Sequence, residues 1–219
     1  MTDTPLTPQQ VVEQLYWRYA TKKFDPSKKI SESEWKTLEQ SLVLSPSSFG
    51  LQPWKFFVVR NPEIRQQLLE HSWGQKQVVD ASHLVVFAIE QDVDKSDVDR
   101  FVKRMSEVQE VPVENLQGFG DMVKGFLSDP PYPLEIDKWS TRQVYIALGF
   151  FMFTAAVLEI DTCPMEGFVP AKYNEVLGLT EMGYSAVVLC CAGYRASDDK
   201  SAARPKVRYS TEEVVTYID

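Results

Sequence analysis

Two short segments at opposite ends of the chain are locally basic, Arg18-Tyr-Ala-Thr-Lys-Lys23 and Arg204-Pro-Lys-Val-Arg208. Guanidinium and ammonium groups bind phosphate through charge-assisted hydrogen bonds. If the fold brings the two segments together, they form a compact anion site suited to a phosphate that carries close to two negative charges. Taken alone, each segment also fits a solvated run of surface charge.

A second candidate is the segment Leu44-Ser-Pro-Ser-Ser-Phe-Gly-Leu-Gln-Pro-Trp54, where a helix is expected to end and a strand to begin. Pro46 disfavours a helical conformation in the residue before it, and Gly50 permits a positive φ. Two serine hydroxyls, an amide and an indole in one turn suit a flat ligand with polar edges. A plain connection between helix and strand is the alternative.

Several familiar catalytic patterns are missing from the sequence. It has no Gly-x-x-x-x-Gly-Lys loop, no Gly-x-Gly-x-x-Gly turn after a strand and no Gly-x-Ser-x-Gly elbow. With two histidines and no Cys-x-x-Cys pair, we expect no zinc site and no catalytic triad. A small phosphorylated cofactor that carries the reaction remains the simplest interpretation.

Composition bounds the class of protein. The 219 residues are 44% hydrophobic, which fits one globular domain, and the net charge of −8 disfavours nucleic acid and anionic lipid as partners. The longest apolar stretch, 144–158, is shorter than the ~20 residues that cross a bilayer. No basic leader followed by an apolar run opens the sequence, so we expect a cytoplasmic protein, and the three cysteines fit a reducing compartment.

The expected elements alternate between helix and strand. Capping patterns at Thr7 and Ser31 predict helices over about 8–20 and from 32 to just before Pro46, and Asn61 caps a third through about residue 72. Apolar runs predict strands at 55–59, 84–89 and 185–192, the last two buried. The remaining expectations are a helical excursion over about 93–138, an apolar helix at 139–159, a short helix at 170–177 and an edge strand at 212–218.

The ordered set of motifs resembles the nitroreductase family of FMN flavoproteins. The blocks that carry the resemblance run from residue 18 to 208, in the family's order: Arg18-x-x-x-Lys22-x-Phe24, Ser45-Pro-Ser-Ser-x-x-x-Gln-Pro-Trp54, Asp80-Ala-Ser-His-x-Val-Val-Phe87, Gln143, Pro164-Met-Glu-Gly-Phe168 and Pro205-Lys-Val-Arg208. Each block is weak by itself, but the ordered set is specific.

The resemblance implies an α+β fold of three layers over the single domain 1–219, with a mixed central sheet flanked by helices. It also implies a homodimer with FMN at the subunit interface. Carried over, Arg18, Lys22, Lys206 and Arg208 hold the phosphate and ribityl side, with Lys22 also near the pyrimidine edge of the ring. The other implied cofactor-binding residues are Pro46, Ser47 and Ser48 of the partner subunit, Pro164 and Met165 near one ring face, and the backbone of Glu166 and Gly167 near flavin N5.

The sequence departs from the family pattern at several positions. Tyr19 and Ala20 stand where many members have histidine and serine, so only main-chain contacts are carried over there. Ring-edge contacts are assigned to Gln75 or Gln77. Gln143 is either a flavin contact or an amide satisfied inside the protein. Cys163 and His83 are expected to fill space in the core rather than to react.

The activity that the resemblance implies is a ping-pong oxidoreduction. NADH or NADPH gives two electrons to FMN and leaves, and a small acceptor such as a nitroaromatic compound or a quinone then takes them, so the protein would be a nitroreductase or quinone reductase. No residue is expected to be catalytic by itself, and Lys22 is expected to stabilise the reduced flavin electrostatically. Alternatives are a specialised FMN enzyme that fragments flavin or removes halide, and a flavin-binding or sensing module without turnover.

Overall fold

The computed structural model describes residues 6–218. The strands are β1 (Trp54–Val59), β2 (His83–Glu90), β3 (Asp161–Met165) and β4 (Tyr184–Gly193). The α-helices are α1 (Pro8–Trp17), α2 (Glu32–Val43), α3 (Pro62–Glu70), α4 (Gln77–Asp80), α5 (Lys95–Gln109), α6 (Gln117–Ser128), α7 (Ile136–Val157), α8 (Pro170–Leu177) and α9 (Thr211–Val214). Short 3₁₀ turns occupy Ser48–Gly50, Val113–Leu116 and Thr180–Met182.

The four strands form one sheet in the order β1-β2-β4-β3, and every pair of neighbouring strands is antiparallel. The expected mixed sheet is therefore corrected in detail, because parallel pairing among the described residues is limited to an isolated bridge between Ala20 and Thr162. That bridge lays the chain after α1 along β3. Pro164 is compatible with β3 because this strand lies at the edge of the sheet.

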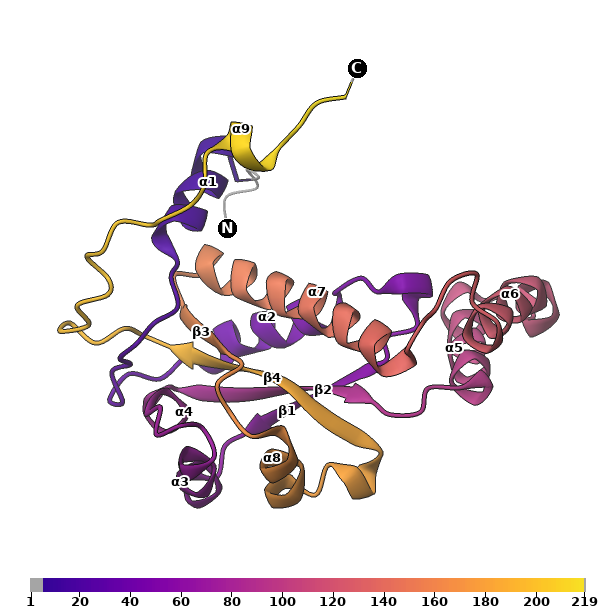
Figure 1. Cartoon of the computed structure of the whole chain (residues 1–219), viewed down its shortest axis with the longest axis horizontal. Coiled ribbons are helices and arrows are strands. Elements are labelled where there is room, and N and C mark those ends of the chain that lie inside the picture. Colours follow the sequence, from indigo (N-terminus) through magenta and orange to yellow (C-terminus); the bar gives the residue numbers. More distant parts are fainter. Residues whose placement is uncertain (1–5, 219) are drawn as a thin grey trace.

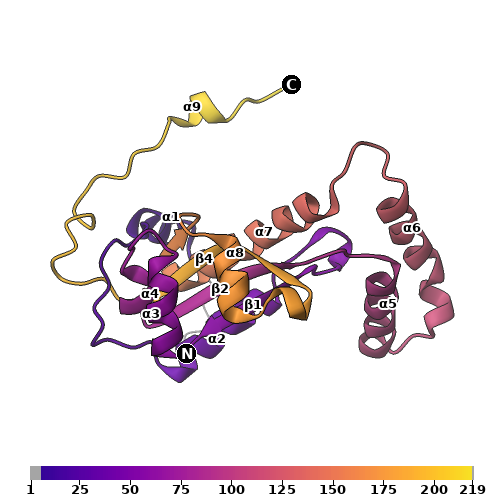
Figure 2. The same ribbon diagram turned by 60° about the horizontal axis from the view of Figure 1, so that its bottom comes forward.

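Helices cover both faces of the sheet, which confirms the predicted three-layer α+β fold (Figures 1 and 2). Alternate residues of β2 face opposite sides, as the two-residue period of a strand requires. Val85 and Phe87 pack with Trp35 of α2 and Phe151 of α7. Leu84 and Val86 belong to the other core, which is covered by α3, α4 and α8. β2 is therefore buried on both faces.

Helix starts follow the predicted caps. Thr7 and Ser31 each accept a hydrogen bond from the backbone N–H three residues later, in complete capping boxes, and the Asn61 side chain caps α3. Helix ends were harder to predict. α1 ends at Trp17, three residues before the predicted end, because Arg18 is extended and the next residues pair with β3.

The predicted helical excursion is present as α5 and α6, which project to one side of the sheet (Figure 2). They have a small core of their own, to which Val98, Val123 and Trp139 contribute. Phe119 and Phe126 pack against this core, and the Phe126 ring contacts Phe49 edge-on with 5.0 Å between ring centroids. The excursion therefore rests on the turn that precedes β1.

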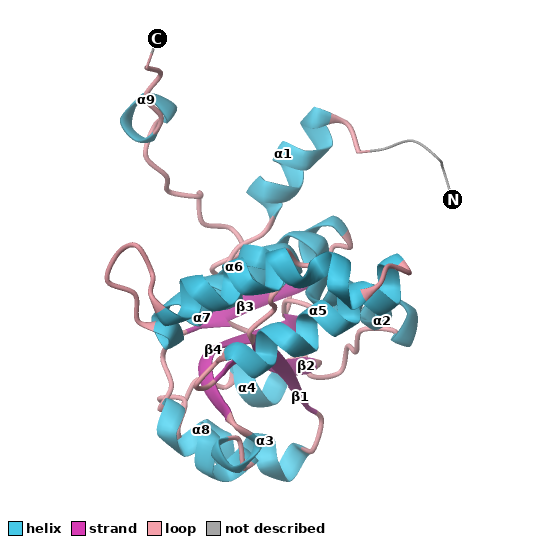
Figure 3. Ribbon diagram, turned by 90° about the vertical axis from the view of Figure 1, so that its right-hand side faces the viewer, coloured by secondary structure: helices cyan, strands magenta, loops and turns pink. Residues whose placement is uncertain are grey.

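The edge strand predicted at 212–218 is wrong. A capping box between Ser210 and Glu213 starts the short helix α9 instead, and the segment after it is extended without a strand partner among the described residues. The tail extends away from the sheet (Figure 3), and Tyr209, just before it, lines a cavity with Leu15 and Tyr16 of α1. A strand requires a hydrogen-bonded neighbour, which this part of the chain lacks among residues 6–218.

None of the helices within 6–218 has a run of residues both long and apolar enough to cross a bilayer.

His83 opens β2 and is half-buried at the edge of the core. Its ring stacks on Trp35 with 3.8 Å between centroids and an interplanar angle of 8°. The Ser82 hydroxyl accepts the Ile30 N–H at 2.9 Å and lies 3.0 Å from His83 Nδ1. The hydroxyl can donate to Nδ1 only while that nitrogen carries no proton. Burial, together with the charges of Arg60, Arg65 and Lys29, lowers the pKa of His83 from 6.5 to about 4.

This geometry predicts a pH-dependent stability. In the unfolded chain His83 is protonated below about pH 6.5, whereas in the folded chain it is protonated only below about pH 4. The contribution of neutral His83 to the free energy of unfolding is therefore complete above pH 6.5 and is lost as the pH falls from 6.5 towards 4. Urea unfolding at pH 7 and pH 5 should show a smaller loss of stability for His83→Phe than for the wild type. An equal loss in both proteins contradicts the assignment.

Candidate functional site

The two basic segments converge. They line a cavity of about 400 Å³ where the chain leaving α1 meets the segment after β4. Arg18, Lys206 and Arg208 contribute positively charged side chains, and Tyr19 and Ala20 lie on its wall. The other lining residues are Tyr16, Trp17, Ser201, Ala202, Arg204 and Pro205. The structure therefore joins residues that are almost 190 positions apart in the sequence.

The positive charge of this cavity is not neutralised from within. Over residues 6–218, none of Arg18, Lys206 and Arg208 forms an ion pair with a carboxylate, and neither does Lys22, which is not one of the cavity-lining residues. Arg18 Nε is buried without a hydrogen-bond partner, and Lys206 Nζ donates to the Arg18 carbonyl. A buried donor without a partner is costly, so this cluster is suited to an anion with several acceptor oxygens.

The pKa shifts have the same origin. Burial, and then the neighbouring charge of Arg208, lowers the pKa of Arg18. Burial, and then the charges of Arg18 and Arg208, lowers the pKa of Lys206. Bringing three cations together without a counter-ion is unfavourable for the protein alone, and a bound dianion would relieve it.

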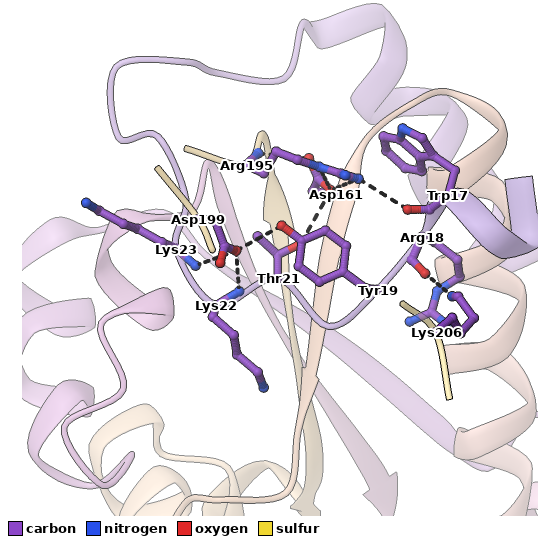
Figure 4. A network of polar contacts seen from close by, with 10 residues as sticks. All are labelled: Trp17, Arg18, Tyr19, Thr21, Lys22, Lys23, Asp161, Arg195, Asp199 and Lys206. Atoms are coloured by element: carbon purple, nitrogen blue, oxygen red, sulfur yellow. Dashed lines mark hydrogen bonds and ion pairs between the residues drawn. The ribbon is translucent and has the colours of Figure 1, made fainter. Parts of the chain in front are cut away.

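The chain from Trp17 to Lys23 is fixed by two aspartates that the sequence reading did not select (Figure 4). Asp161 of β3 accepts hydrogen bonds from Arg195 N at 2.8 Å and Arg195 Nε at 2.7 Å. The Arg195 guanidinium in turn lies over the rings of Trp17 and Tyr19, 4.3 and 4.7 Å from their centroids. Asp199 holds the same chain from the other side. A charged residue beside the apolar run 162–165 was a usable signal for Asp161, whereas Asp199 stands in a polar loop that offered none.

Lys22 lies next to this network. Its N–H donates to Asp199 Oδ2 at 2.9 Å, while its side chain is exposed and extends away from Asp199 (Figure 4). The Tyr19 hydroxyl also donates to Asp199 Oδ2, and Ala20 forms the bridge to Thr162. The main chain of both residues is thereby fixed at the cavity wall.

The segment after β3 is closely enclosed. Gln75 Nε2 donates to the Gly167 carbonyl at 2.8 Å. A Cβ added at Gly167 would lie 2.7 Å from Gln75 Nε2 and 3.0 Å from Cε3 of Trp73, so a larger residue here would displace the Gln75 side chain. Gln77, in contrast, is buried in the first turn of α4. Of the two glutamines left open by the sequence, Gln75 is the one in contact with the 166–167 turn.

A second cavity, of about 410 Å³, lies between α7 and β3. Pro164, Met165 and Glu166 form one wall, with Val188 beside them, and Tyr145, Leu148 and Met152 of α7 form the other. Tyr145 donates to Glu166 Oε1 at 2.5 Å, and burial followed by this hydrogen bond raises the pKa of Tyr145 to about 12. The Tyr145 side chain of α7 therefore fixes the 164–166 wall at Glu166.

The hydroxyl-bearing turn, the segment between α2 and β1 that carries Ser47 and Ser48, lies away from both cavities. Ser47 Oγ accepts the Gln52 N–H, and the Ser48 N–H donates to Gln143 Oε1, both at 2.9 Å. Gln143 Nε2 donates to the Trp139 carbonyl, so this amide is satisfied inside the protein. Gly50 has φ +73°, and a Cβ there would lie 2.9 Å from Cζ of Phe101.

This turn and the cationic cavity occupy opposite ends of the sheet. The segment between α2 and β1 lies at the end covered by α5 and α6, whereas the chain after α1 lies at the other end (Figure 1). One protomer therefore does not bring Pro46, Ser47 and Ser48 to Arg18 and Lys206.

The three cysteines are buried, and burial raises the pKa of each thiol. Cys163 lies behind Pro164 in the core and, as expected, fills space. Within residues 6–218 no group of three or more histidine, cysteine, aspartate or glutamate side chains is placed to hold a metal ion.

Comparison with known proteins gives a consistent result. A family model described as the nitroreductase family matches residues 15–194. A Bacillus subtilis protein named "Putative NAD(P)H nitroreductase YfkO" is 38% identical over 219 residues, covering 95% of this chain and 97% of that protein. A Staphylococcus epidermidis protein named "Putative NAD(P)H nitroreductase SERP2086" is 38% identical over 222 residues, covering 96% and 98%.

Solved structures share the fold at low sequence identity. A Bacillus subtilis protein described as "putative nitroreductase ydfN" superposes with a TM-score of 0.84 at 18% identity, covering 97% of this chain and 100% of that one. An Exiguobacterium sibiricum protein described as a "putative nitroreductase in complex with FMN" has a TM-score of 0.79 at 22% identity, and the match covers 100% of both chains.

The unpaired cations predict that phosphate stabilises the ligand-free protein. Phosphate should raise the melting temperature above that in sodium chloride of equal ionic strength, because it binds the folded state alone. Arg208→Gln should weaken phosphate binding about tenfold, since it removes one charge-assisted contact. Arg60→Gln is the matched control, because Arg60 is exposed, lies 3.9 Å from Glu32 and does not line the cavity. An equal phosphate effect in all three proteins contradicts the anion site.

Proposed function

The chain belongs to the nitroreductase family, and we propose that it is an FMN-dependent oxidoreductase. In this proposal it takes two electrons from NADH or NADPH and gives them to a small nitroaromatic or quinone-type acceptor by a ping-pong mechanism. The observation that carries the proposal is the cationic cavity, where Arg18 Nε is buried without a partner and Lys206 and Arg208 have no carboxylate partner within residues 6–218. Such a cluster fits the phosphate of FMN.

The residues around this cavity have the chemistry that the cofactor needs. Arg18, Lys206 and Arg208 would hold the phosphate. Lys22 would lie at the polar edge of the ring, and Gln75 is the better placed of the two glutamines for the same edge because it contacts Gly167. The main chain at Glu166 and Gly167 would face the reacting part of the ring, with Pro164 and Met165 against its plane.

Homodimerisation would complete the site. Pro46, Ser47 and Ser48 lie at the far end of the protomer from the cavity, so a second copy would have to supply them. The protomer also leaves large apolar side chains uncovered. α1 has no buried residue, and Tyr145, Ile146 and Phe150 of α7 are 38–46% exposed. Exposed apolar surfaces of this kind mark protein interfaces, and a two-fold axis would pair them.

When bound, FMN supplies the redox chemistry by accepting a hydride from the reduced nicotinamide and passing two electrons to the acceptor. The protein supplies orientation and charge. The positive charge of Lys22 would stabilise negative charge that develops at the polar edge of the ring, and this favours transfer of electrons in pairs. The main chain at 166–167, fixed by Gln75 and by the Tyr145–Glu166 hydrogen bond, would present its N–H groups without reorganisation.

The experiment that tests the proposal is stopped-flow reduction of the purified protein under anaerobic conditions. A yellow protein should lose its flavin absorbance on mixing with NADH or NADPH, and the absorbance should return on addition of a quinone or nitroaromatic acceptor. Parallel lines in double-reciprocal plots would support ping-pong order. Bound flavin that neither nicotinamide reduces would instead indicate a binding or sensing module, and a colourless protein that takes up no FMN would refute the proposal.

Lys22→Ala should raise the dissociation constant of FMN and slow flavin reduction, each by about tenfold, because it removes positive charge at the site where negative charge develops. Lys23→Ala is the matched control, since the Lys23 side chain is 55% exposed and pairs with Asp198. Fluorescence titration and stopped-flow reduction measure the two effects. Normal affinity and a normal rate in Lys22→Ala would rule out this role.

A further inference from the structure

Asp199 connects the two halves of the cationic cavity. The residue is 8% exposed, and both carboxylate oxygens accept hydrogen bonds. Oδ2 accepts from the Tyr19 hydroxyl at 2.9 Å, from Lys22 N at 2.9 Å and from Lys23 N at 3.1 Å (Figure 4). Oδ1 accepts from Ser201 N at 2.9 Å.

These hydrogen bonds join segments that carry different cavity residues. Tyr19, Lys22 and Lys23 belong to the segment that contains Arg18, whereas Ser201 belongs to the segment that leads to Lys206 and Arg208. The Ala196 N–H also donates to the Lys23 carbonyl at 2.9 Å. Asp199 thus fixes the distance between the two sources of positive charge.

The carboxylate does not neutralise the cavity that it helps to build. Asp199 is not one of the cavity-lining residues, and it forms no ion pair with Arg18, Lys206 or Arg208 within the described chain. Its carboxylate accepts hydrogen bonds from main-chain N–H groups and from one hydroxyl. Burial by itself would raise the pKa of Asp199, but the hydrogen bonds from Ser201, Tyr19, Lys22 and Lys23 outweigh burial and lower the pKa.

An amide at this position cannot make the same contacts. Four donors surround the carboxylate, three at one oxygen and one at the other. Asparagine has one acceptor oxygen, so in either orientation its NH₂ group faces at least one donor. The isosteric change therefore removes a contact without removing volume.

We propose that Asp199 is a positioning residue that holds the two cationic segments at the separation required by a phosphate, and that it thereby makes the site select FMN over riboflavin. This inference rests on the proposed function. In this proposal the preference for FMN over riboflavin depends on the separation of the cations as well as on their charge. Loss of the Asp199 hydrogen bonds between the two segments should therefore reduce the affinity for FMN more than the affinity for riboflavin.

The test compares flavin binding by full-length variants, measured by quenching of flavin fluorescence with FMN and with riboflavin. In Asp199→Asn the ratio of the riboflavin to the FMN dissociation constant should fall by about 10-fold or more, which is the loss of a hydrogen bond to a charged group. Asp198→Asn is the matched control. Asp198 is the preceding residue, its side chain is 66% exposed and it pairs with Lys23, so its ratio should equal that of the wild type.

The outcomes separate the two proposals. A wild type that binds neither flavin refutes the proposed function. A wild type that binds FMN more tightly than riboflavin, with an unchanged ratio in a folded Asp199→Asn variant, overturns only the positioning role. An equal loss for both flavins indicates general destabilisation and also overturns it.

Tyr19→Phe keeps the test decisive if Asp199→Asn does not fold. It removes one of the three donors to Oδ2 and leaves the main-chain N–H groups in place. The ratio should then fall by about two- to fivefold, in keeping with the loss of one neutral hydrogen-bond donor. No fall in this variant overturns the proposal.

Discussion

The central constraint on this structure is the mutual repulsion of three cations that the fold holds around one cavity. Arg18, Lys206 and Arg208 come together on a chain whose net charge is −8, yet none has a carboxylate partner within residues 6–218. Acidic residues are close by, but their carboxylates bind groups other than these three cations. Asp161 binds Arg195, and Asp199 binds main-chain N–H groups. The cavity therefore keeps a positive charge that a bound anion can balance.

The antiparallel sheet makes this arrangement possible. β3 and β4 are neighbours, so the chain that leaves β4 emerges beside the start of β3. The bridge between Ala20 and Thr162 brings the chain after α1 to the same edge. Two cores, one on each face of the sheet, hold these strands rigidly. The cation cluster is thus supported by elements whose own stability comes from apolar packing.

The same topology separates the hydroxyl-bearing turn from the cations. The turn is tied to α7 through Gln143 and to the excursion through Gly50 and Phe101, at the far end of the sheet. In the proposed homodimer each site would combine the cations of one copy with the turn of the other. Folding, dimerisation and cofactor binding would then depend on one another.

The sequence by itself determined the local structure and the family. Capping boxes at Thr7 and Ser31, the apolar period of β2 and the ordered motif blocks all depend on residues that are close together in the chain. The tertiary structure alone decided the rest. It showed that Asp161 and Asp199 fix the basic segment, that α1 stops at Trp17, that the strands pair antiparallel and that the tail forms no strand within the protomer. The physical reason is that hydrogen bonds between groups 34 to 180 residues apart leave no periodic trace in the sequence, whereas helix caps and strand alternation do.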